Sequence, residues 1–177
     1  LIVMNILVTG GAGFIGSHTC LLLLERGYFV YVIDSFVNSS PKSLDKILEI
    51  NKLKKTNFQN KLKVFYGDLL DKNFLDNVFS GLTKINQKID AVIHFAGLKS
   101  VSESVSKPLK YWQVNVVGTL NLLEVMEEYN CNTLVFSSSA TVYAQSENIL
   151  LLENSPIKPI NPYGSTKYTI ECILKDI

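Results

Sequence analysis

The segment Val8–Gly16 constrains the fold of this chain more than any other stretch. It follows an apolar run, residues 2–8, which predicts a buried strand, and it precedes a leucine-rich run, residues 17–26, which predicts a buried helix. A glycine-rich turn between a buried strand and a helix is typical of nucleotide-binding α/β folds. The segment therefore predicts a sheet of parallel strands with a ligand site beyond its first strand.

The glycines of this turn have the spacing G-x-x-G-x-x-G, a close relative of the dinucleotide-binding fingerprint G-x-G-x-x-G. Gly10 allows a sharp turn out of the strand, Gly13 allows the backbone to approach a pyrophosphate, and Gly16 allows the helix to pack closely on the strand. The N–H groups and the positive end of the helix dipole then point at the phosphates.

An acidic residue stands where a dinucleotide site requires one. The second apolar run, residues 29–33, ends at Asp34, close to the offset of about 20 residues at which a carboxylate meets the adenosine ribose. A carboxylate there accepts hydrogen bonds from the ribose hydroxyls and repels a 2′-phosphate, so the pattern predicts NAD rather than NADP. The alternative is that Asp34 only ends a strand of an ordinary α/β domain.

Strands and helices alternate along the rest of the chain. Further strands are predicted at residues 62–66, 89–95 and 133–136, and further helices from Ser40-Pro41, from near Asp71, over 108–129 and from Tyr163 onward. This alternation predicts a Rossmann-type, doubly wound parallel sheet with helices on both faces.

Two positions allow more than one interpretation. Asp68 follows the third strand, where it could bind the adenine amino group or could instead cap the helix that begins near Asp71. His94 lies within the fourth strand, and a hydrogen-bonded core histidine is preferred over a catalytic one.

The predicted helix over residues 108–129 contains an apolar stripe, which we expect to be buried. Asn115 and Gly118 interrupt this helix, and a glycine inside a helix costs about 1 kcal/mol, so a close contact is expected there. The stripe consists of Leu109, Trp112, Val116, Leu120, Leu123 and Met126.

Length and composition exclude several classes of protein. The 177 residues suffice for one domain, and a net charge of +1 with 47% hydrophobic residues argues against disorder and against nucleic-acid binding. The apolar N-terminal run is too short to span a membrane and lacks the basic residues of a signal peptide. With two histidines and no C-x-x-C pair, no metal site is expected. The cysteines, Cys20, Cys131 and Cys172, are expected to be buried thiols in a reducing compartment, with a cytoplasmic location as the default.

The chemical centre is predicted at Tyr163 and Lys167, which are neighbours on one helix face. A free tyrosine has a pKa near about 10, and lowering it by about 3 units requires about 4 kcal/mol. A cation about 5 Å away contributes roughly 3 kcal/mol at an effective dielectric constant of about 20. Three hydroxyls, Ser137 to Ser139, follow the fifth strand, where ligands bind in this fold.

This set of motifs resembles the extended short-chain dehydrogenase/reductase superfamily and, within it, the UDP-glucose 4-epimerase family. The resemblance covers essentially all 177 residues. The matching segments are Thr9–Thr19, His94–Lys99, Glu103–Val105, Lys107–Leu109, Phe136–Tyr143 and Asn161–Gly164.

The resemblance implies a role for each motif. Tyr163 would act as the base, Lys167 as its electrostatic partner and ribose ligand, and Ser139 as a hydrogen-bond partner of the sugar 4-oxygen. The residues implied in NAD binding are Gly10, Gly13, Phe14, Ile15, Gly16, Asp34, Asn38, Ser39, Asp68, Leu69, Phe95, Ala96, Gly97, Leu98, Lys99, Tyr163 and Lys167. Those implied in substrate binding are Lys99, Ser139, Thr141 and Tyr163. The implied reaction interconverts UDP-galactose and UDP-glucose through a 4-keto sugar, with NAD retained.

The chain departs from the family pattern in three ways. Ala144 and Ser102 stand where the family usually has glycine, which we interpret as loop variation. The family also has a mostly C-terminal substrate region, so residues 1–177 are expected to be an incomplete NAD-binding Rossmann domain, truncated before that region. The resemblance further implies a homodimer of the parent protein through residues 108–129 and 163–177.

Two other functions stay open. A nucleotide-sugar 4,6-dehydratase would usually carry an acidic pair where this chain has Ala140-Thr141, which argues against elimination chemistry. A non-catalytic NAD-binding sensor or scaffold on the same fold is the second alternative. The intact Ser139, Tyr163 and Lys167 argue against it.

Overall fold

The computed structural model describes residues 3–53, 60–144 and 150–177. The chain divides into two compact units. The first comprises residues 1–96 and 121–137, and the second comprises residues 97–120 and 138–177.

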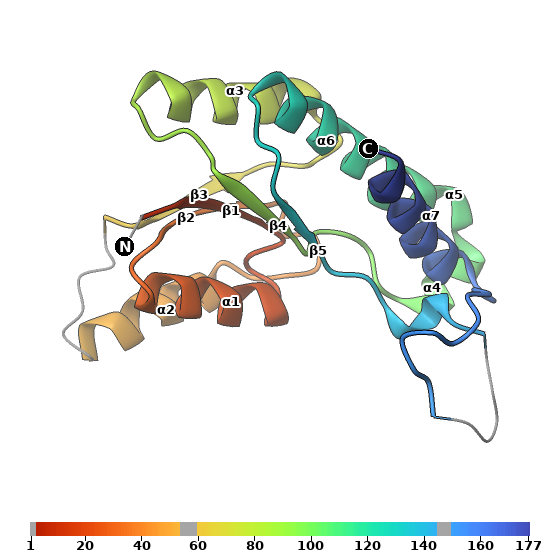
Figure 1. Ribbon diagram of the computed structural model, residues 1–177. Coiled ribbons are helices and arrows are strands. Elements are labelled where there is room, and N and C mark those ends of the chain that lie inside the picture. The colour runs from red at the N-terminus through yellow and green to blue at the C-terminus, as the bar shows by residue number, and fades with distance from the viewer. Residues whose placement is uncertain (1–2, 54–59, 145–149) are drawn as a thin grey trace. The chain divides into compact units, whose positions relative to one another are not determined.

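The first unit is built on a sheet of five parallel strands (Figure 1). The strands are β1 (Asn5–Thr9), β2 (Phe29–Asp34), β3 (Leu62–Tyr66), β4 (Ala91–His94) and β5 (Leu134–Phe136), and their order is β3-β2-β1-β4-β5. The order reverses between β1 and β4, which in open parallel sheets is the point where ligands bind at the carboxyl ends of the strands. The predicted fold class is therefore confirmed.

Helices cover both faces of this sheet. Helices α1 (Phe14–Glu25) and α2 (Lys42–Leu53) lie on one face, and α3 (Lys72–Lys84) and the greater part of α6 (Gly118–Glu128) lie on the other (Figure 1). Helix α1 begins three residues earlier than the leucine-rich run predicted, because the glycine turn closes directly into its first turn. The predicted start of α2 at Ser40-Pro41 is displaced by one to two residues, to Lys42.

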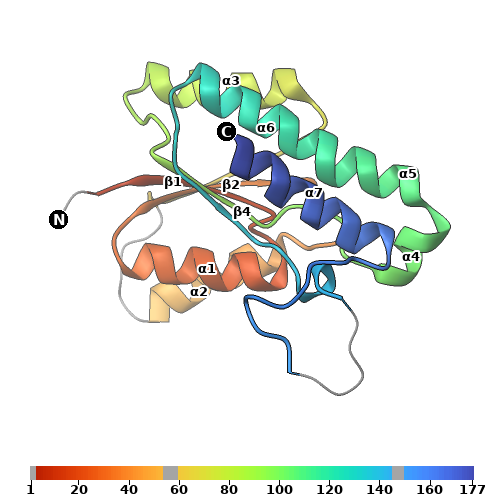
Figure 2. The same ribbon diagram turned by 45° about the vertical axis from the view of Figure 1, so that its right-hand side comes forward.

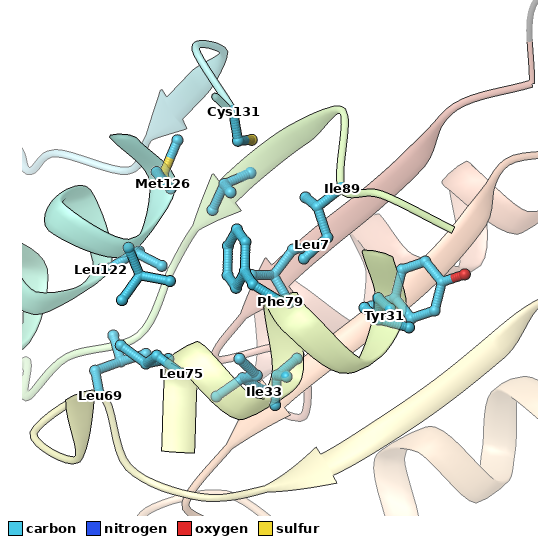
Figure 3. Close-up of a cluster of buried hydrophobic side chains, with 14 residues drawn as sticks. Leu7, Tyr31, Ile33, Leu69, Leu75, Phe79, Ile89, Leu122, Met126 and Cys131 are labelled. Carbon is cyan, nitrogen blue, oxygen red and sulfur yellow. The ribbon is translucent and has the colours of Figure 1, made fainter. Parts of the chain in front are cut away.

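The alternation of side chains along the strands separates two buried cores. Leu7, Tyr31 and Ile33 point to the face covered by α3 and α6, where Phe79 and Leu122 pack against them (Figure 3). The intervening strand residues point to the opposite face, toward α1 and α2. The members of that second core are Ile6, Val8, Ala12, Cys20, Leu24, Val30, Val32, Leu44 and Ile47. Successive side chains of a strand point to opposite faces, so strands buried on both sides have nearly continuous apolar sequences.

The second unit is helical. It contains α4 (Val101–Ser106), α5 (Pro108–Tyr111), a π-helix η1 (Trp112–Val117), a 3₁₀-helix η2 (Ala140–Val142) and α7 (Pro162–Asp176), and α7 runs alongside α5 and η1 (Figure 2). Tyr143 and Ile157 form an isolated antiparallel bridge.

The apolar stripe predicted for residues 108–129 is wrong in part. Leu109, Trp112 and Leu120 are exposed, whereas Val116 and Met126 are buried as expected. The buried face lies one residue earlier than predicted both before and after η1, because packing against neighbouring elements, and not the apolar spacing alone, decides which side of the helix is covered. The residues that are buried instead are Tyr111, Asn115, Thr119, Leu122 and Val125.

Candidate functional site

The glycine turn of the first unit is held by two close backbone approaches. Gly10 has φ +68°, and a Cβ on it would lie 2.7 Å from the backbone nitrogen of Ala96, so the turn after β1 packs directly on the chain leaving β4. A Cβ on Gly16 would collide with the carbonyl oxygen of Gly10 and lie 2.8 Å from the Cα of Gly11. Both positions require glycine, as the fingerprint predicted.

The N-terminus of α1 is open for an anion. Gly13 is its N-cap, contributes no side chain to the first-turn N–H groups, and no acidic residue occupies that turn. A Cβ on Gly13 would meet only the Gly10 carbonyl oxygen, at 3.2 Å. Phe14 and Ile15 are 78% and 59% exposed, unusual for apolar side chains beside a core. This cradle fits the pyrophosphate of a dinucleotide.

The carboxylate of Asp34 is buried and tied to the same turn. Its Oδ2 accepts a hydrogen bond from the N–H of Ala12 at 2.9 Å. Its Oδ1 accepts hydrogen bonds from the N–H of Phe36, at 2.9 Å, and from the hydroxyl of Ser39, at 2.8 Å. A carboxylate offers about four acceptor positions, so one position and the rotatable Ser39 hydroxyl stay compatible with a ribose hydroxyl. The residues present fit the adenosine ribose of NAD.

The other cofactor candidates of this unit lie in the loops that follow β2, β3 and β4. Asn38 is exposed, Leu69 is buried, and Phe95 and Ala96 are partly buried. Asp68 accepts a hydrogen bond from the N–H of Leu70 at 3.0 Å.

The alternative role proposed for Asp68 is wrong, because Asp71 caps α3 instead. The side chain of Asp71 accepts a hydrogen bond from the N–H of Phe74 at 2.9 Å. Asp68 lies too early in the chain for that role, and it closes a local turn.

The interpretation of His94 as a core residue is confirmed. It is 1% exposed, and its Nδ1 lies 2.6 Å from the hydroxyl oxygen of Thr9. The same hydroxyl accepts a hydrogen bond from the N–H of Ala96 at 3.3 Å. Thr9 and His94 therefore brace the ends of β1 and β4 beneath the glycine turn.

In the second unit, the first turn of α7 is fixed from two sides. Asn161 caps the helix by accepting a hydrogen bond from the N–H of Gly164 at 2.8 Å, and Pro162 follows as the first helical residue. A Cβ on Gly164 would lie 2.5 Å from the carbonyl oxygen of Thr141, so the helix start packs closely on η2. Tyr163 lies between these two anchors.

Lys167 lies one turn further along α7, and its side chain is 5% exposed. Burial lowers its pKa from 10.5 to about 8, because the charged ammonium loses hydration. Lys167 thus follows Tyr163 by one helical turn, as the Tyr-x-x-x-Lys spacing predicts, and its burial is an additional finding.

Ser139 is the N-cap of the 3₁₀-helix η2. Its hydroxyl accepts a hydrogen bond from the N–H of Thr141 at 3.2 Å and lies 2.9 Å from the Thr141 hydroxyl. The preceding Ser138 donates a hydrogen bond to the carboxylate of Glu171 on α7. Ser139 and Thr141, both predicted to bind substrate, thus lie on a segment that Ser138 anchors to α7, the helix of Tyr163 and Lys167.

The loop after β4 is held by Asn115, whose contact partners the sequence did not identify. Its Oδ1 accepts a hydrogen bond from the N–H of Leu98 at 2.8 Å. Its Nδ2 donates hydrogen bonds to the Leu98 carbonyl at 3.0 Å and to the Thr166 hydroxyl at 3.2 Å. Gly97 has φ +147° beside this amide, and Lys99 is exposed. Asn115 thus interrupts the apolar pattern because its amide holds this loop, while the close contact expected from Gly118 stays a prediction.

Several expectations concern features elsewhere in the chain. In the described ranges, no helix is long and apolar enough to cross a membrane, and no cluster of metal-binding side chains occurs. Cys20 and Cys131 are buried free thiols, and burial raises the pKa of Cys20 to about 12. The expected burial of Cys172 is wrong, because it lies on the exposed side of α7.

Comparison with known proteins gives consistent matches. Residues 7–177 match the protein-family model described as GDP-mannose 4,6 dehydratase. The chain is 52% identical to UDP-glucose 4-epimerase 2 of Arabidopsis thaliana and 51% identical to UDP-glucose 4-epimerase of Yersinia enterocolitica, over 98% of its own length and 47% and 48% of theirs.

The fold is also similar to that of solved structures. A crystal structure of UDP-glucose 4-epimerase from Bifidobacterium longum in complex with NAD⁺ and UDP matches with a TM-score of 0.85 and 41% identity. The match covers 98% of this chain and 48% of that one. The chain thus spans about half the length of the relatives that it matches.

Proposed function

Because the chain belongs to the GDP-mannose 4,6 dehydratase family and is similar over 98% of its length to UDP-glucose 4-epimerases, we propose that it carries the NAD-binding and proton-transfer part of such an epimerase. The reaction is the interconversion of UDP-galactose and UDP-glucose. Residues 1–177 act in this proposal as an incomplete NAD-binding Rossmann domain. In this proposal, the substrate region that the family resemblance implies would supply most contacts to the uridine diphosphate.

Each candidate residue has a defined task in the proposal. The glycine turn and the N-terminus of α1 bind the pyrophosphate, and Asp34 binds the adenosine ribose. Tyr163 takes the proton of the sugar 4-hydroxyl and returns it, while Lys167 favours the phenolate and Ser139 holds the 4-oxygen. NAD, when bound, accepts and returns the hydride of the sugar C4.

The observation that carries the proposal is the burial of Lys167 one turn after Tyr163. The Lys167 ammonium group is 5% exposed and therefore loses most of its hydration. A lysine on the solvated face of a surface helix would not have this cost. Such a cost is typical of functional sites, where charged groups are held in place for chemistry. A lysine of this kind strengthens the electrostatic field that acts on a neighbouring phenol.

The residues support the two alternative functions less well. Neither Ala140 nor Thr141 in η2 can transfer a proton as the acidic pair of a dehydratase would. A sensor that only binds NAD could use Lys167 as a ribose ligand, but it would have no use for Ser139, which the proposal assigns to the sugar 4-oxygen.

The test is to incubate the chain with NAD and UDP-galactose and to measure UDP-glucose formation and retained NAD. We expect retained NAD, and Tyr163→Phe is expected to abolish any turnover while retaining NAD. Tyr168→Phe, on the same helix, is the control and should behave like the unsubstituted chain. Turnover that survives Tyr163→Phe would contradict the role of Tyr163, and failure to bind NAD would contradict the cofactor assignment.

The proposal includes a homodimer and a cytoplasmic location. Leu109, Trp112 and Leu120 expose apolar surface along α5, η1 and the start of α6, which supports a subunit contact at this helix. Measurement of the molar mass in solution, with Leu109→Asp as the disrupting variant, tests it. The free thiols of Cys20 and Cys131 support a reducing compartment.

A further inference from the structure

Tyr111 is the largest fully buried side chain in the described part of the protein. It is the last residue of α5, in the second unit. Neither its spacing nor the family resemblance assigned it a role, and its expected neighbours on the apolar stripe are exposed. Its contacts are therefore the best guide to what it does.

The hydroxyl of Tyr111 holds the first turn of α4. It accepts a hydrogen bond from the N–H of Ser100 at 3.0 Å and donates one to Oε2 of Glu103 at 3.1 Å. Ser100 is also the N-cap of α4, since its side chain accepts a hydrogen bond from the N–H of Glu103. The phenol thus fixes the chain immediately after Lys99, a predicted ligand of NAD and substrate.

The charges around the Tyr111 hydroxyl fix which partner donates and which accepts in its hydrogen bond with Glu103. The hydrogen bond from Lys110, at 3.1 Å, lowers the pKa of Glu103, and Lys107 lies 3.8 Å away. Burial, followed by the Glu103 carboxylate, raises the pKa of Tyr111. Glu103 therefore stays an acceptor and Tyr111 stays a donor.

The ring of Tyr111 contacts the proposed base. Its centroid lies 6.5 Å from that of Tyr163, with an interplanar angle of 80°. This edge-to-face geometry is one of the two arrangements that aromatic pairs prefer. Because Tyr111 is fully buried and tethered by its hydroxyl, its ring is a fixed surface against which the Tyr163 ring rests.

We propose that Tyr111 is a positioning residue for the reaction: its ring sets the orientation of Tyr163, and its hydroxyl holds Ser100 and with it the loop of Lys99. The first half of this inference rests on the proposed function of Tyr163 as the base. The two halves can be separated, because Tyr111→Phe removes only the hydroxyl and Tyr111→Leu removes both contacts.

The test uses nuclear magnetic resonance of the chain without NAD or sugar. In the unsubstituted chain we expect a nuclear Overhauser effect between the rings of Tyr111 and Tyr163. In Tyr111→Phe the Ser100 amide should exchange with solvent about tenfold faster, while the Tyr163 ring signals stay in place. In Tyr111→Leu both the exchange rate of the Ser100 amide and the positions of the Tyr163 ring signals should change. Tyr129→Phe is the matched control, since the Tyr129 hydroxyl also donates to a carboxylate, Asp76, at 2.7 Å in the first unit.

The inference is overturned if the two rings show no Overhauser effect, or if Ser100 exchange in Tyr111→Phe equals that of the control. Neither readout depends on catalysis or on the folding of the leucine variant. In protein that converts UDP-galactose, Tyr111→Leu should lower kcat about tenfold with KM changed less than about twofold, and Tyr111→Phe should recover most of kcat. Equal losses of kcat in both variants would overturn the role of the ring. Absence of turnover in the unsubstituted protein would count against the epimerase proposal only.

Discussion

The N–H of Ala12 donates a 2.9 Å hydrogen bond to Oδ2 of Asp34, so the glycine turn after β1 is tied directly to the acid at the end of β2. The sequence offered two alternatives for Asp34, a ribose ligand or a residue that ends a strand. The structure shows that the carboxylate also organises the turn itself. A change at Asp34 is therefore expected to affect stability before any ligand is added.

Asp34→Asn should lower the free energy of unfolding by about 1–3 kcal/mol, because an amide cannot accept hydrogen bonds at both of its terminal atoms. Urea denaturation measures this loss, and NAD titration should show weaker binding in the same variant. Asp68→Asn is the matched control, since Asp68 accepts a single backbone hydrogen bond in an exposed turn. Equal losses in the two variants would contradict the organising role of Asp34.

Gly16→Ala should destabilise the chain by about 2–3 kcal/mol, because the added methyl group collides with the backbone of Gly10 and Gly11. Gly81→Ala provides the comparison within another helix of the same unit. A Cβ on Gly81 meets nothing within 4 Å, so this variant should gain about 0.5–1 kcal/mol from helix propensity. Thermal unfolding of both variants checks the prediction, and a Gly16→Ala variant as stable as Gly81→Ala would contradict it.

Lys167→Met should stabilise the chain at pH 7 while removing its proposed chemistry. Burial lowers the pKa of Lys167 from 10.5 to about 8, so between these values the unfolded chain binds more protons than the folded one. Stability from this group therefore rises with pH across the window from 8 to 10.5, and below pH 8 the full cost is present, roughly 3 kcal/mol.

The measurement is the melting temperature of both proteins between pH 7 and 10.5. The advantage of Lys167→Met should be largest at pH 7 and should shrink as the pH rises. Lys175→Met, at an exposed position of the same helix, should show no such trend. An advantage that is independent of pH would contradict the assigned cause.

Asn115→Asp should cost about 3 kcal/mol, because a carboxylate oxygen would replace the amide that donates to Leu98 and Thr166 in a site that is 2% exposed. The loss should grow as the pH rises, since burial disfavours the ionised carboxyl group in the folded state. Asn121→Asp is the control, because the Asn121 amide also donates to two carbonyls but is only partly buried. Denaturant unfolding at pH 5 and pH 8 distinguishes the two variants.

The sheet and the glycine turn were predictable because their signals are local. The apolar runs of β1, β2 and β4 are continuous, since these strands are buried on both faces. Residues of the kinds that bind a dinucleotide stand at the ends of β1 and β2, where a glycine follows the first strand and an acid is the last residue of the second. Strand ends moved by no more than three residues. The sequence also placed Tyr163 and Lys167 on one helix with an Asn161-Pro162 start, as observed.

The features that were missed depend on long-range packing or on a choice between similar side chains. Helix α4 was not predicted, although Ser100 and Glu103 have the S-x-x-E spacing of a helix start, and Ser100 does cap the helix. Asp71 rather than Asp68 caps α3, which composition alone could not decide. The role proposed for Tyr111 could not be predicted from the sequence, because an aromatic residue in a helix is ordinarily part of the hydrophobic core. Only its contacts with Ser100, Glu103 and Tyr163 distinguish it from such a residue.

The π-helix η1 has a consequence for changes in chain length. Its hydrogen bonds span one residue more than those of an α-helix, so a deletion of one residue within Trp112–Val117 would let the segment close into α-helical turns. Because an α-turn completes the same rotation with fewer residues, the residues on either side of the deletion would keep nearly their present orientation. Tyr111 and Thr119, both buried now, would still face inward together. The bulged turn thus acts as a one-residue reserve of chain length, and the segment should tolerate a deletion of one residue far better than an insertion.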